Sequence, residues 1–598
     1  MGYKHIGGLI KEQAIKYQQK NVLYFQPKES SLWKGISWIS FEEKIKKTAK
    51  ALLNYGIKEA DTVAIFSQNS AEWIVSDFAV MSVRAVTVPM YATNSTAEVE
   101  YVVNDAEIAV IFVGGQEQFD KSLEVLNTGN VLKLIVVFDS GTNLRNSPNA
   151  VYFEDFINES FNESVETELQ KRYYESNLED LASIIYTSGT TGEPKGVMLN
   201  HRNFSEVLEA HDFELNVDNT DVSLGFLPLS HVYERTWVLF CLYKGVSVYI
   251  NSNPKIIAQV IQEVKPTLMC TVPRIFEKIY AAIDEKSKEA SKIKKNLMLW
   301  GLKVGNQYYN WHKRIEKPVP FFLKLKFKIA QKFVLSKLQG VFGGNIKFMP
   351  CGGAPLSKEL VKFFHSFGLN IKCGYGLTET TATVCLFGDT NFEFDSVGKP
   401  LKGTEINIGE NNEILVKGPG VMQGYYKKPE ETEKVFKNGW FCTGDAGKMD
   451  ASGNLIITDR IKDLMKTSGG KYIAPQKLET ALVNDSFIEQ IAVIGDQQKY
   501  VTALAVPSFE NLKAYALKHK INFNSIEELI AHNQIKEMFE KRFEELQKEF
   551  SVFEKIKKFT LLPKEFSIEA GEITATLKLK RKVIEQKYKE LIQKMYTE

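Results

Sequence analysis

Short apolar runs rich in β-branched residues alternate with amphipathic segments along the first third of the chain. Runs typical of buried strands are Thr62–Phe66, Ile108–Val113 and Leu134–Phe138. Helical periodicity predicts helices over Phe41–Asn54, Ala71–Arg84 and Ala97–Asn104. Ser40 and Glu43 have the spacing of a capping box at the start of the first of these helices. Such alternation favours an α/β fold with largely parallel sheets.

The pattern changes near residue 460. Turn residues gather at Asp450–Asn454, and short strands and charged helices follow Asp459-Arg460. We therefore expect a domain boundary around Arg460–Lys462. It separates a large N-terminal domain of layered sheets and helices, residues 1–460, from a small α+β C-terminal domain, residues 461–598, which is long enough for a core of its own.

Charge is balanced overall but uneven locally. The 598 residues carry a formal net charge of +2, which gives no reason to expect a nucleic-acid partner. Residues 286–337, however, hold 14 Lys and Arg against two Asp and Glu. This stretch is therefore +12, and the remainder of the chain is about −10.

The basic stretch lies in a helical, aromatic-rich insertion, residues 283–338, interrupted by Pro318 and Pro320. Charged and apolar residues alternate closely around Leu325, so we favour a solvated helical insertion. The alternative is a surface helix that contacts anionic lipid through residues 286–337. The sequence leaves the oligomeric state open.

The cysteines and the N-terminus indicate the compartment. Six cysteines without a CxxC pair predict buried, reduced thiols rather than a disulfide framework. The first residues contain no apolar segment typical of a signal peptide. No apolar run approaches the ~18 residues of a membrane span. We expect a cytoplasmic protein, with peripheral attachment to the inner face of the membrane as the open alternative.

The segment Tyr186–Gly196 carries the clearest chemistry. It reads YTSGTTGEPKG and follows an apolar run, so it places three glycines, four hydroxyls and a lysine in one short loop. Backbone N–H groups, hydroxyls and a cation together suit a polyphosphate. A Walker A loop is excluded, because Pro194 stands where its second glycine would be. So dense a pattern is unlike a simple turn.

With this loop the chain resembles the adenylate-forming superfamily of acyl-CoA synthetases, luciferases and peptide-synthetase adenylation domains. Five further motifs follow in the order found in that family: Gly352–Pro355, Gly374–Thr380, Gly439–Asp445, Asp459–Lys466 and Thr576–Arg581. The resemblance covers nearly the whole chain. It implies an N-terminal adenylation domain and a mobile C-terminal domain that swings between two orientations.

The resemblance implies an ATP site. Glu379 and Thr187 would hold Mg²⁺, Tyr375 would stack on adenine, and Asp445 with Arg460 would bind the ribose. The remaining residues implied to bind ATP are Ser188, Gly189, Thr190, Thr191, Gly192, Lys195, Gly352, Gly353, Gly376, Thr378 and Lys466.

The C-terminal motif implies the catalytic lysine. Its spacing selects Lys578, which would stabilise charge while a carboxylate attacks the α-phosphate of ATP. Lys580 takes that role if the register is shifted by two residues. Lys462 would be the hinge between the domains, where the backbone must absorb a large rotation.

Two segments resemble the long-chain fatty acyl-CoA synthetase branch: Leu227–Arg235 and Val272–Tyr280. In that branch His231 would lie beside the acyl-adenylate at the entrance of the acyl tunnel. Some relatives close this tunnel with a tryptophan, but Arg235 stands at that spacing here and Trp237 lies two residues beyond.

The implied activity is that of an AMP-forming long-chain-fatty-acid–CoA ligase. It uses ATP, Mg²⁺ and CoA and converts a fatty carboxylate first to an acyl-adenylate and then to a thioester. One alternative keeps the chemistry but changes the acceptor, as in an acyl-carrier-protein synthetase or a fatty acyl-AMP ligase. A second alternative is a catalytically silent, membrane-associated lipid-binding protein on the same fold.

Overall fold

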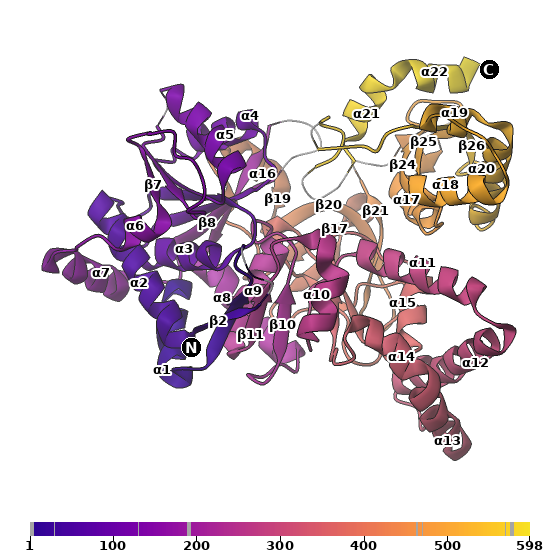
Figure 1. Ribbon diagram of the computed structural model, residues 1–598, viewed down its shortest axis with the longest axis horizontal. Coiled ribbons are helices and arrows are strands. Elements are labelled where there is room, and N and C mark those ends of the chain that lie inside the picture. The colour runs from indigo at the N-terminus through magenta and orange to yellow at the C-terminus, as the bar shows by residue number, and fades with distance from the viewer. Residues whose placement is uncertain are drawn as a thin grey trace.

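The computed structural model describes residues 5–28, 30, 32–129, 131–187, 193–461, 465–468, 471–568, 570–574 and 579–597, without the side chains of Lys466 and Tyr472. Sheets and helices form a large N-terminal part, and a smaller body follows it at the C-terminal end (Figure 1). The expected α/β class is therefore confirmed.

The largest sheet of the described residues has eight strands in the order β18-β9-β8-β4-β3-β5-β6-β7. Their bounds are β3 Thr62–Ser67, β4 Val86–Tyr91, β5 Val110–Val113, β6 Leu134–Val137, β7 Ala150–Tyr152, β8 Leu181–Thr187, β9 Lys195–Asn200 and β18 Gly424–Tyr425. Strands β3 to β8 run parallel, whereas β9 is antiparallel to β8 and β18 is antiparallel to β9.

Both faces of this sheet are covered by helices. In β3, Val63 and Ile65 belong to the core beneath α2 (Trp38–Tyr55) and α3 (Ala71–Ser82), whereas Ala64 and Phe66 belong to the core beneath α4 (Thr96–Asp105) and α5 (Gln116–Asn127). Successive residues of a strand point to opposite faces. Strands covered on both sides are continuously apolar, which is why these runs were recognisable in the sequence.

The first long helix begins earlier than the sequence predicted. Helix α2 starts at Trp38, and its N-cap is Ser37, whose hydroxyl oxygen accepts the backbone N–H of Ser40 at 3.2 Å. Ser40 is therefore inside the helix, and the predicted capping box is wrong. Trp38 is fully buried, so tertiary packing adds a turn before the polar residues that suggested a start.

Three smaller sheets complete the N-terminal part in the described residues. One has the order β10-β11-β1-β2, with β1 Asn21–Phe25, β2 Lys34–Ser37, β10 Val222–Gly225 and β11 Ser247–Ile250. Another has the order β12-β13-β14-β15, with β12 Met349–Cys351, β13 Ile371–Tyr375, β14 Cys385–Leu386 and β15 Lys399–Pro400. The last is antiparallel and contains β16 Glu405–Ile408, β17 Glu413–Lys417, β19 Phe436–Lys437, β20 Trp440–Met449 and β21 Leu455–Arg460.

Further helices pack around these sheets. They are α1 Leu9–Tyr17, α6 Phe153–Ile157, α7 Glu163–Glu175, α8 His201–Glu214, α9 Val232–Lys244, α10 Ile257–Val264, α15 Lys358–His365 and α16 Pro429–Val435.

The insertion is helical, as expected. It consists of the end of α11 (Pro273–Glu289), α12 (Lys292–Tyr308), the π-helical turn η3 (Tyr309–Lys313), α13 (Phe321–Ala330), the π-helical turn η4 (Gln331–Leu335) and α14 (Ser336–Gln339). Two glycines let α12 approach its neighbours. A Cβ on Gly301 would lie 2.6 Å from the Val334 side chain, and one on Gly305 would lie 1.9 Å from the carbonyl oxygen of Ser366.

The C-terminal part has a core of its own. Its elements in the described residues are β22 Met465–Lys466, β23 Tyr472–Ile473, α17 Pro475–Val483, β24 Ile488–Ile494, β25 Val501–Pro507, α18 Phe509–Lys518, α19 Ile526–Ala531, α20 Asn533–Leu546, β26 Ile556–Leu561, α21 Arg581–Lys587 and α22 Lys589–Thr597. Strands β24, β25 and β26 form a sheet that α17 and α20 cover.

The six cysteines are free and buried, as the sequence predicted. Across the described ranges, no helix has the length and apolar character needed to span a bilayer.

Candidate active site

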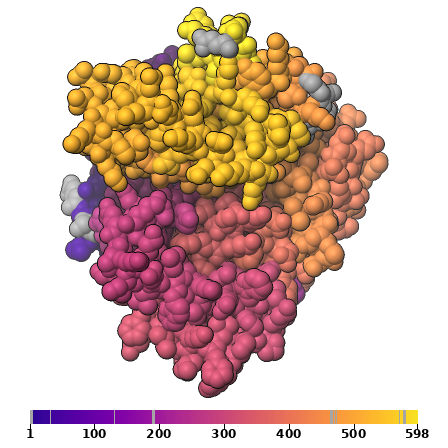
Figure 2. Space-filling model, turned by 90° about the vertical axis from the view of Figure 1, so that its right-hand side faces the viewer, coloured from indigo at the N-terminus to yellow at the C-terminus, as the bar shows by residue number. Residues whose placement is uncertain are grey.

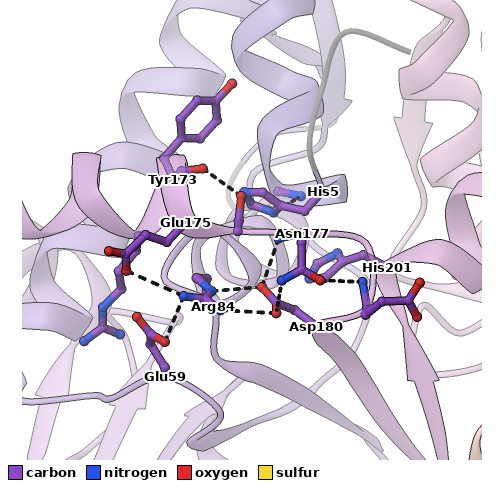
Figure 3. Close-up of polar contacts among 12 residues, drawn as sticks. His5, Glu59, Arg84, Tyr173, Glu175, Asn177, Asp180 and His201 are labelled. Carbon is purple, nitrogen blue, oxygen red and sulfur yellow. Dashed lines mark hydrogen bonds and ion pairs between the residues drawn. The ribbon is translucent and has the colours of Figure 1, made fainter.

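The base of the β8–β9 hairpin, which carries the predicted phosphate loop, is held by a half-buried polar cluster. Asp180, just before β8, accepts two bonds from the Arg84 guanidinium at 2.8 and 3.2 Å. Figure 3 shows Arg84 between Asp180, Glu59 and Glu175. The backbone N–H of His201, just after β9, donates to the carbonyl of Asp180 at 3.1 Å. Both ends of the hairpin are thus fixed at one point.

The predicted phosphate-loop residues Thr187 and Lys195 flank the loop at its two ends. They are paired across β8 and β9, and Thr187 Oγ1 lies 3.5 Å from the carbonyl oxygen of Lys195. The Lys195 ammonium contacts Glu431 of α16 at 2.5 Å and lies 5.0 Å from the centre of the Tyr425 ring. The lysine is therefore held beside the loop by a carboxylate and an aromatic face.

Glu379 contacts β18, the strand that pairs with β9. It lies in η6 (Thr378–Thr380), a short helical turn soon after β13, and its Oε1 accepts the Tyr425 hydroxyl at 3.0 Å. The carbonyl of Glu379 also accepts the backbone N–H of Met422 at 2.8 Å. Burial, together with the adjacent Glu379 carboxylate, raises the pKa of Tyr425 well above its usual value. The phenol stays protonated and remains a donor to Glu379.

Oxygen donors at the end of β8 and in η6 are of the type that suits Mg²⁺. Thr187 offers a hydroxyl and Glu379 a carboxylate, both hard oxygen ligands of the kind that Mg²⁺ prefers. In the part of the chain that the structure describes, no three His, Cys, Asp or Glu side chains are grouped for a metal. Two protein donors leave the other coordination positions to phosphate oxygens and water, as is usual for this ion in nucleotide sites.

The predicted adenine-binding residues lie at the carboxyl ends of two adjacent parallel strands. Gly352 and Gly353 follow β12, and Tyr375 ends β13, with Cys351 paired to Cys373. Gly353 has φ +82°, a conformation that favours glycine. A Cβ on Gly376 would lie 1.6 Å from the carbonyl oxygen of Ala382, so the turn after β13 requires glycine.

Both carboxylate oxygens of Asp445, the predicted ribose-binding residue, accept hydrogen bonds. The Tyr375 hydroxyl donates to Asp445 Oδ2 at 2.7 Å, and Arg460 Nε donates to Oδ1 at 3.0 Å. Asp445 and Arg460 are register partners on β20 and β21. Burial and the Asp445 charge raise the pKa of Tyr375 well above its usual value, so this phenol also remains a donor.

His231 lies at the N-terminus of α9. Its Nδ1 accepts the backbone N–H of Tyr233 at 3.1 Å, so the neutral ring carries its proton on Nε2. Tyr233 in turn faces the end of β12, because a Cβ on Gly352 would lie 3.5 Å from its ring. The start of α9 is therefore packed against the end of β12.

Arg235 is a structural residue in this arrangement. Its side chain is 1% exposed and donates to Asp77 through Nε at 2.8 Å and through a terminal nitrogen at 2.5 Å. It also donates to the Ser183 hydroxyl on β8 at 2.6 Å. Although Arg235 has the sequence spacing of a gate, these bonds fix it in the core.

Several predicted residues lie outside the described residues and stay predictions. These are Ser188, Gly189, Thr190, Thr191, Gly192, the hinge residue Lys462 and the lysine Lys578, together with the side chain of Lys466. Arg581, close to Lys578 in the chain, binds Glu479 through two nitrogens at 2.7 and 3.1 Å. The end of the C-terminal motif is thus anchored to α17.

The structure adds residues that sequence reasoning missed. Tyr425 and Glu431 hold the predicted Glu379 and Lys195, and the available signal was only a Gly-Tyr-Tyr run before a Pro-Glu-Glu helix start. Arg274 of α11 forms an ion pair with Glu489 of β24 and thereby joins the two parts of the chain.

Comparison with known proteins identifies the family of the chain. The family model described as AMP-binding enzyme matches residues 10–426, and the model for the AMP-binding enzyme C-terminal domain matches residues 462–598. The long-chain-fatty-acid–CoA ligase FadD15 of Mycobacterium tuberculosis is 31% identical over 570 residues, covering 94% of this chain and 93% of the relative. Human long-chain-fatty-acid–CoA ligase 1 is 30% identical over 599 residues, covering 94% and 82%.

Solved structures share the fold. An anthranilate CoA ligase, AuaEII, in complex with anthranoyl-AMP has a TM-score of 0.74 at 17% identity, covering 99% of this chain and 98% of the other. The o-succinylbenzoate CoA synthetase MenE of Bacillus subtilis with ATP and magnesium has a TM-score of 0.66 at 19% identity, covering 96% and 98%. The resemblance inferred from the motifs is confirmed, and the chain belongs to the family of AMP-binding enzymes.

Proposed function

We propose that the chain is an AMP-forming long-chain-fatty-acid–CoA ligase. One observation carries this proposal: the segment from Tyr375 to Glu379 contacts Asp445 at one end and, at the other end, Tyr425, which lies beside Lys195. The same five residues thus link the predicted ribose carboxylate to the predicted metal carboxylate. A single ATP bound along this segment would have its nucleoside and its phosphates at these two ends.

The acyl substrate is proposed from the relatives. FadD15 and the human ligase are named for long-chain fatty acids, and each alignment covers 94% of this chain. ATP and CoA are the co-substrates of such a ligase. Peripheral attachment to the inner face of the membrane through residues 286–337, in an otherwise cytoplasmic protein, is part of the proposal.

In the first half-reaction an oxygen of the fatty carboxylate attacks the α-phosphorus of ATP. A new oxygen–phosphorus bond forms, the bond to the bridging oxygen breaks, and pyrophosphate leaves. Asp445 and Arg460 would hold the ribose, while Lys195 and Lys578 would stabilise the charge that develops on the phosphates. Thr187 and Glu379 would hold Mg²⁺, which would neutralise phosphate charge when bound.

In the second half-reaction the CoA thiolate attacks the acyl carbonyl and AMP leaves. We place the rotation of the C-terminal domain at Lys462, which withdraws Lys578 and makes room for CoA. His231, with its proton on Nε2, would donate a hydrogen bond beside the acyl carbonyl. Lys466 would contact the nucleotide phosphates.

The experiment offers purified protein MgATP, CoA and a series of acids: acetate, octanoate, laurate, palmitate, oleate and arachidate. Mass spectrometry measures acyl-CoA, and AMP is measured as the second product. Thioester formation that peaks at laurate or the longer acids supports the proposal. Acyl-adenylate without acyl-CoA would instead indicate a carrier-protein acceptor or an acyl-AMP ligase, and absence of AMP with every acid would refute ligase activity.

A further inference from the structure

Helix α13 exposes an apolar stripe. Phe322, Leu325 and Ile329 share one face at spacings of three and four residues, and Phe333 continues it into η4. Their side chains are 75%, 52%, 47% and 53% exposed. Within the described residues, nine of the 21 exposed large apolar side chains fall in residues 283–338, less than a tenth of the chain.

The fold does not need this stripe, because α13 has a second apolar face. Leu323, Phe327 and Val334 belong to the core shared with α12, and the Phe327 ring stacks on Tyr308 with 3.7 Å between ring centres. Phe327 against Tyr308 and Val334 against Gly301 make α12 and α13 an antiparallel hairpin. The close alternation in the sequence therefore reflects two apolar faces with lysines between them, and it does not argue against a surface helix.

Lysines border the exposed stripe on both sides. On a helical projection Lys324, Lys328 and Lys332 follow one edge at four-residue intervals, and Lys326 lies on the other. All four are exposed, and none forms an ion pair with another residue that the structure describes. Their charges are thus available to an external anion.

The α12–α13 hairpin protrudes from the protein, so a large flat surface could reach its outer face. In Figure 1 α13 projects beyond the rest of the molecule, and Figure 2 shows this part of the chain forming the lower end of the face in view. Trp311, 66% exposed, lies in η3 at the same end of the hairpin as the start of α13. An apolar stripe with lysine borders and an aromatic residue nearby is typical of helices that lie in the membrane interface.

We propose that the outer face of α13 docks on the surface of an anionic lipid bilayer, with the stripe among the outer acyl carbons and the lysines on the headgroups. The charge distribution favours this partner and fixes the orientation. Residues 286–337 carry +12, whereas the remainder of the chain is about −10 and is repelled by an anionic surface. The inference makes the proposed peripheral attachment specific to one face and is independent of the chemistry.

The test is co-sedimentation of the full chain with vesicles of phosphatidylcholine alone or of equal parts phosphatidylcholine and phosphatidylserine. We expect binding to the mixed vesicles that weakens with salt. The variant Phe322→Ser/Leu325→Ser should bind the vesicles roughly a hundredfold more weakly. This is about tenfold for each apolar side chain that becomes half buried in the bilayer. Leu517→Ser, at an exposed apolar position on α18, is the control and should bind like the unmodified protein.

The charge is tested by Lys324→Gln/Lys328→Gln. Loss of each lysine should weaken binding to the mixed vesicles by about fivefold. The matched control is Lys513→Gln/Lys518→Gln on α18, which removes two exposed lysines far from the insertion in sequence.

Ligase activity on octanoate, a soluble acid, is measured in every variant. Unchanged activity with lost vesicle binding supports the inference. Binding without preference for phosphatidylserine, or an equal loss in the α18 controls, would overturn it. So would a change in mass by light scattering in the Phe322→Ser/Leu325→Ser variant, because the stripe would then join two copies of the chain. Vesicle binding by a chain without ligase activity would reject the proposed function and leave the docking surface standing.

Discussion

Replacing Tyr425 by phenylalanine tests the geometry of the phosphate end of the site. The substitution removes one hydroxyl that donates to Glu379 Oε1 at 3.0 Å and leaves the ring beside Lys195. In the proposed mechanism the Tyr425 hydroxyl acts through Glu379, so Tyr425 is a positioning residue. Its loss should therefore affect the step that needs Glu379 and spare the step that does not.

The magnitude follows from the type of bond. A hydrogen bond to an ionised group contributes about 1.5–3 kcal/mol when buried. Glu379 is half-buried, and water can replace part of the bond, so we take the lower value. At about 1.4 kcal/mol for each factor of ten, Tyr425→Phe should lower kcat/KM for ATP in adenylation roughly tenfold.

The assay separates the two half-reactions. Pyrophosphate exchange into ATP reports adenylation, and thioester formation from supplied acyl-adenylate reports the second step. Tyr425→Phe should slow the first, and added Mg²⁺ should partly restore it, because a misplaced ligand weakens metal binding. Tyr426→Phe is the matched control, since the neighbouring phenol contacts neither Glu379 nor Lys195 in the described structure.

A double-mutant cycle completes the test. Once Glu379→Gln has been made, adding Tyr425→Phe should cost little more, because the two residues act through one bond. Equal slowing of both half-reactions by Tyr425→Phe would refute the positioning role. So would full activity of this variant at limiting Mg²⁺.

Three further predictions concern the C-terminal lysine and the N-terminal core. Lys578→Ala should slow adenylation roughly a hundredfold or more and spare thioesterification of supplied acyl-adenylate, with Lys580→Ala as control; equal loss of both steps rejects the role. Asp77→Ala leaves the 1%-exposed Arg235 charged and unpaired, so urea unfolding should show a loss of about 3–5 kcal/mol, and a loss below about 1 kcal/mol contradicts the buried pair. Burial lowers the pKa of His211 from 6.5 to about 4, so protonation of the unfolded chain should reduce stability as the pH falls through this range, by up to about 3 kcal/mol. His211→Gln should reduce the loss of unfolding free energy between pH 6.5 and 4. An unchanged dependence of stability on pH would contradict the role of His211.

Much of the fold was predictable because β3, β5 and β6 are buried on both faces and therefore read as apolar runs. Helix ends were less predictable. Ser37 and Ser40 both offer an N-cap hydroxyl, and the packing of Trp38 in the core decides for Ser37. The two faces of α13 were equally hidden, because only the position of α12 shows which apolar residues are covered.

The candidate site, too, was predictable only in part from the sequence. The sequence predicts roles for Glu379, Asp445 and Lys195 because they lie in motifs with fixed spacing. Tyr425, the partner of Glu379, and Glu431, the partner of Lys195, come from a different part of the chain, which the pairing of β18 with β9 brings to the site. The spacing of a motif predicts contacts between residues of one loop. Contacts between strands that are far apart in the sequence can be seen only once the sheet has formed.

The bonds around Asp445 bear on how the enzyme would retain its intermediate. Arg460 ends β21 and binds Asp445, and the proposed hinge at Lys462 comes two residues later. Rotation beyond that point would leave Tyr375, Asp445 and Arg460 undisturbed. The ribose of the acyl-adenylate would stay bound to Asp445 and Arg460. At the acyl-phosphate end, Lys578 would leave and the CoA thiol would take its place. Release of the reactive anhydride to water would therefore be slow relative to its capture, and few ATP molecules would be consumed without forming a thioester.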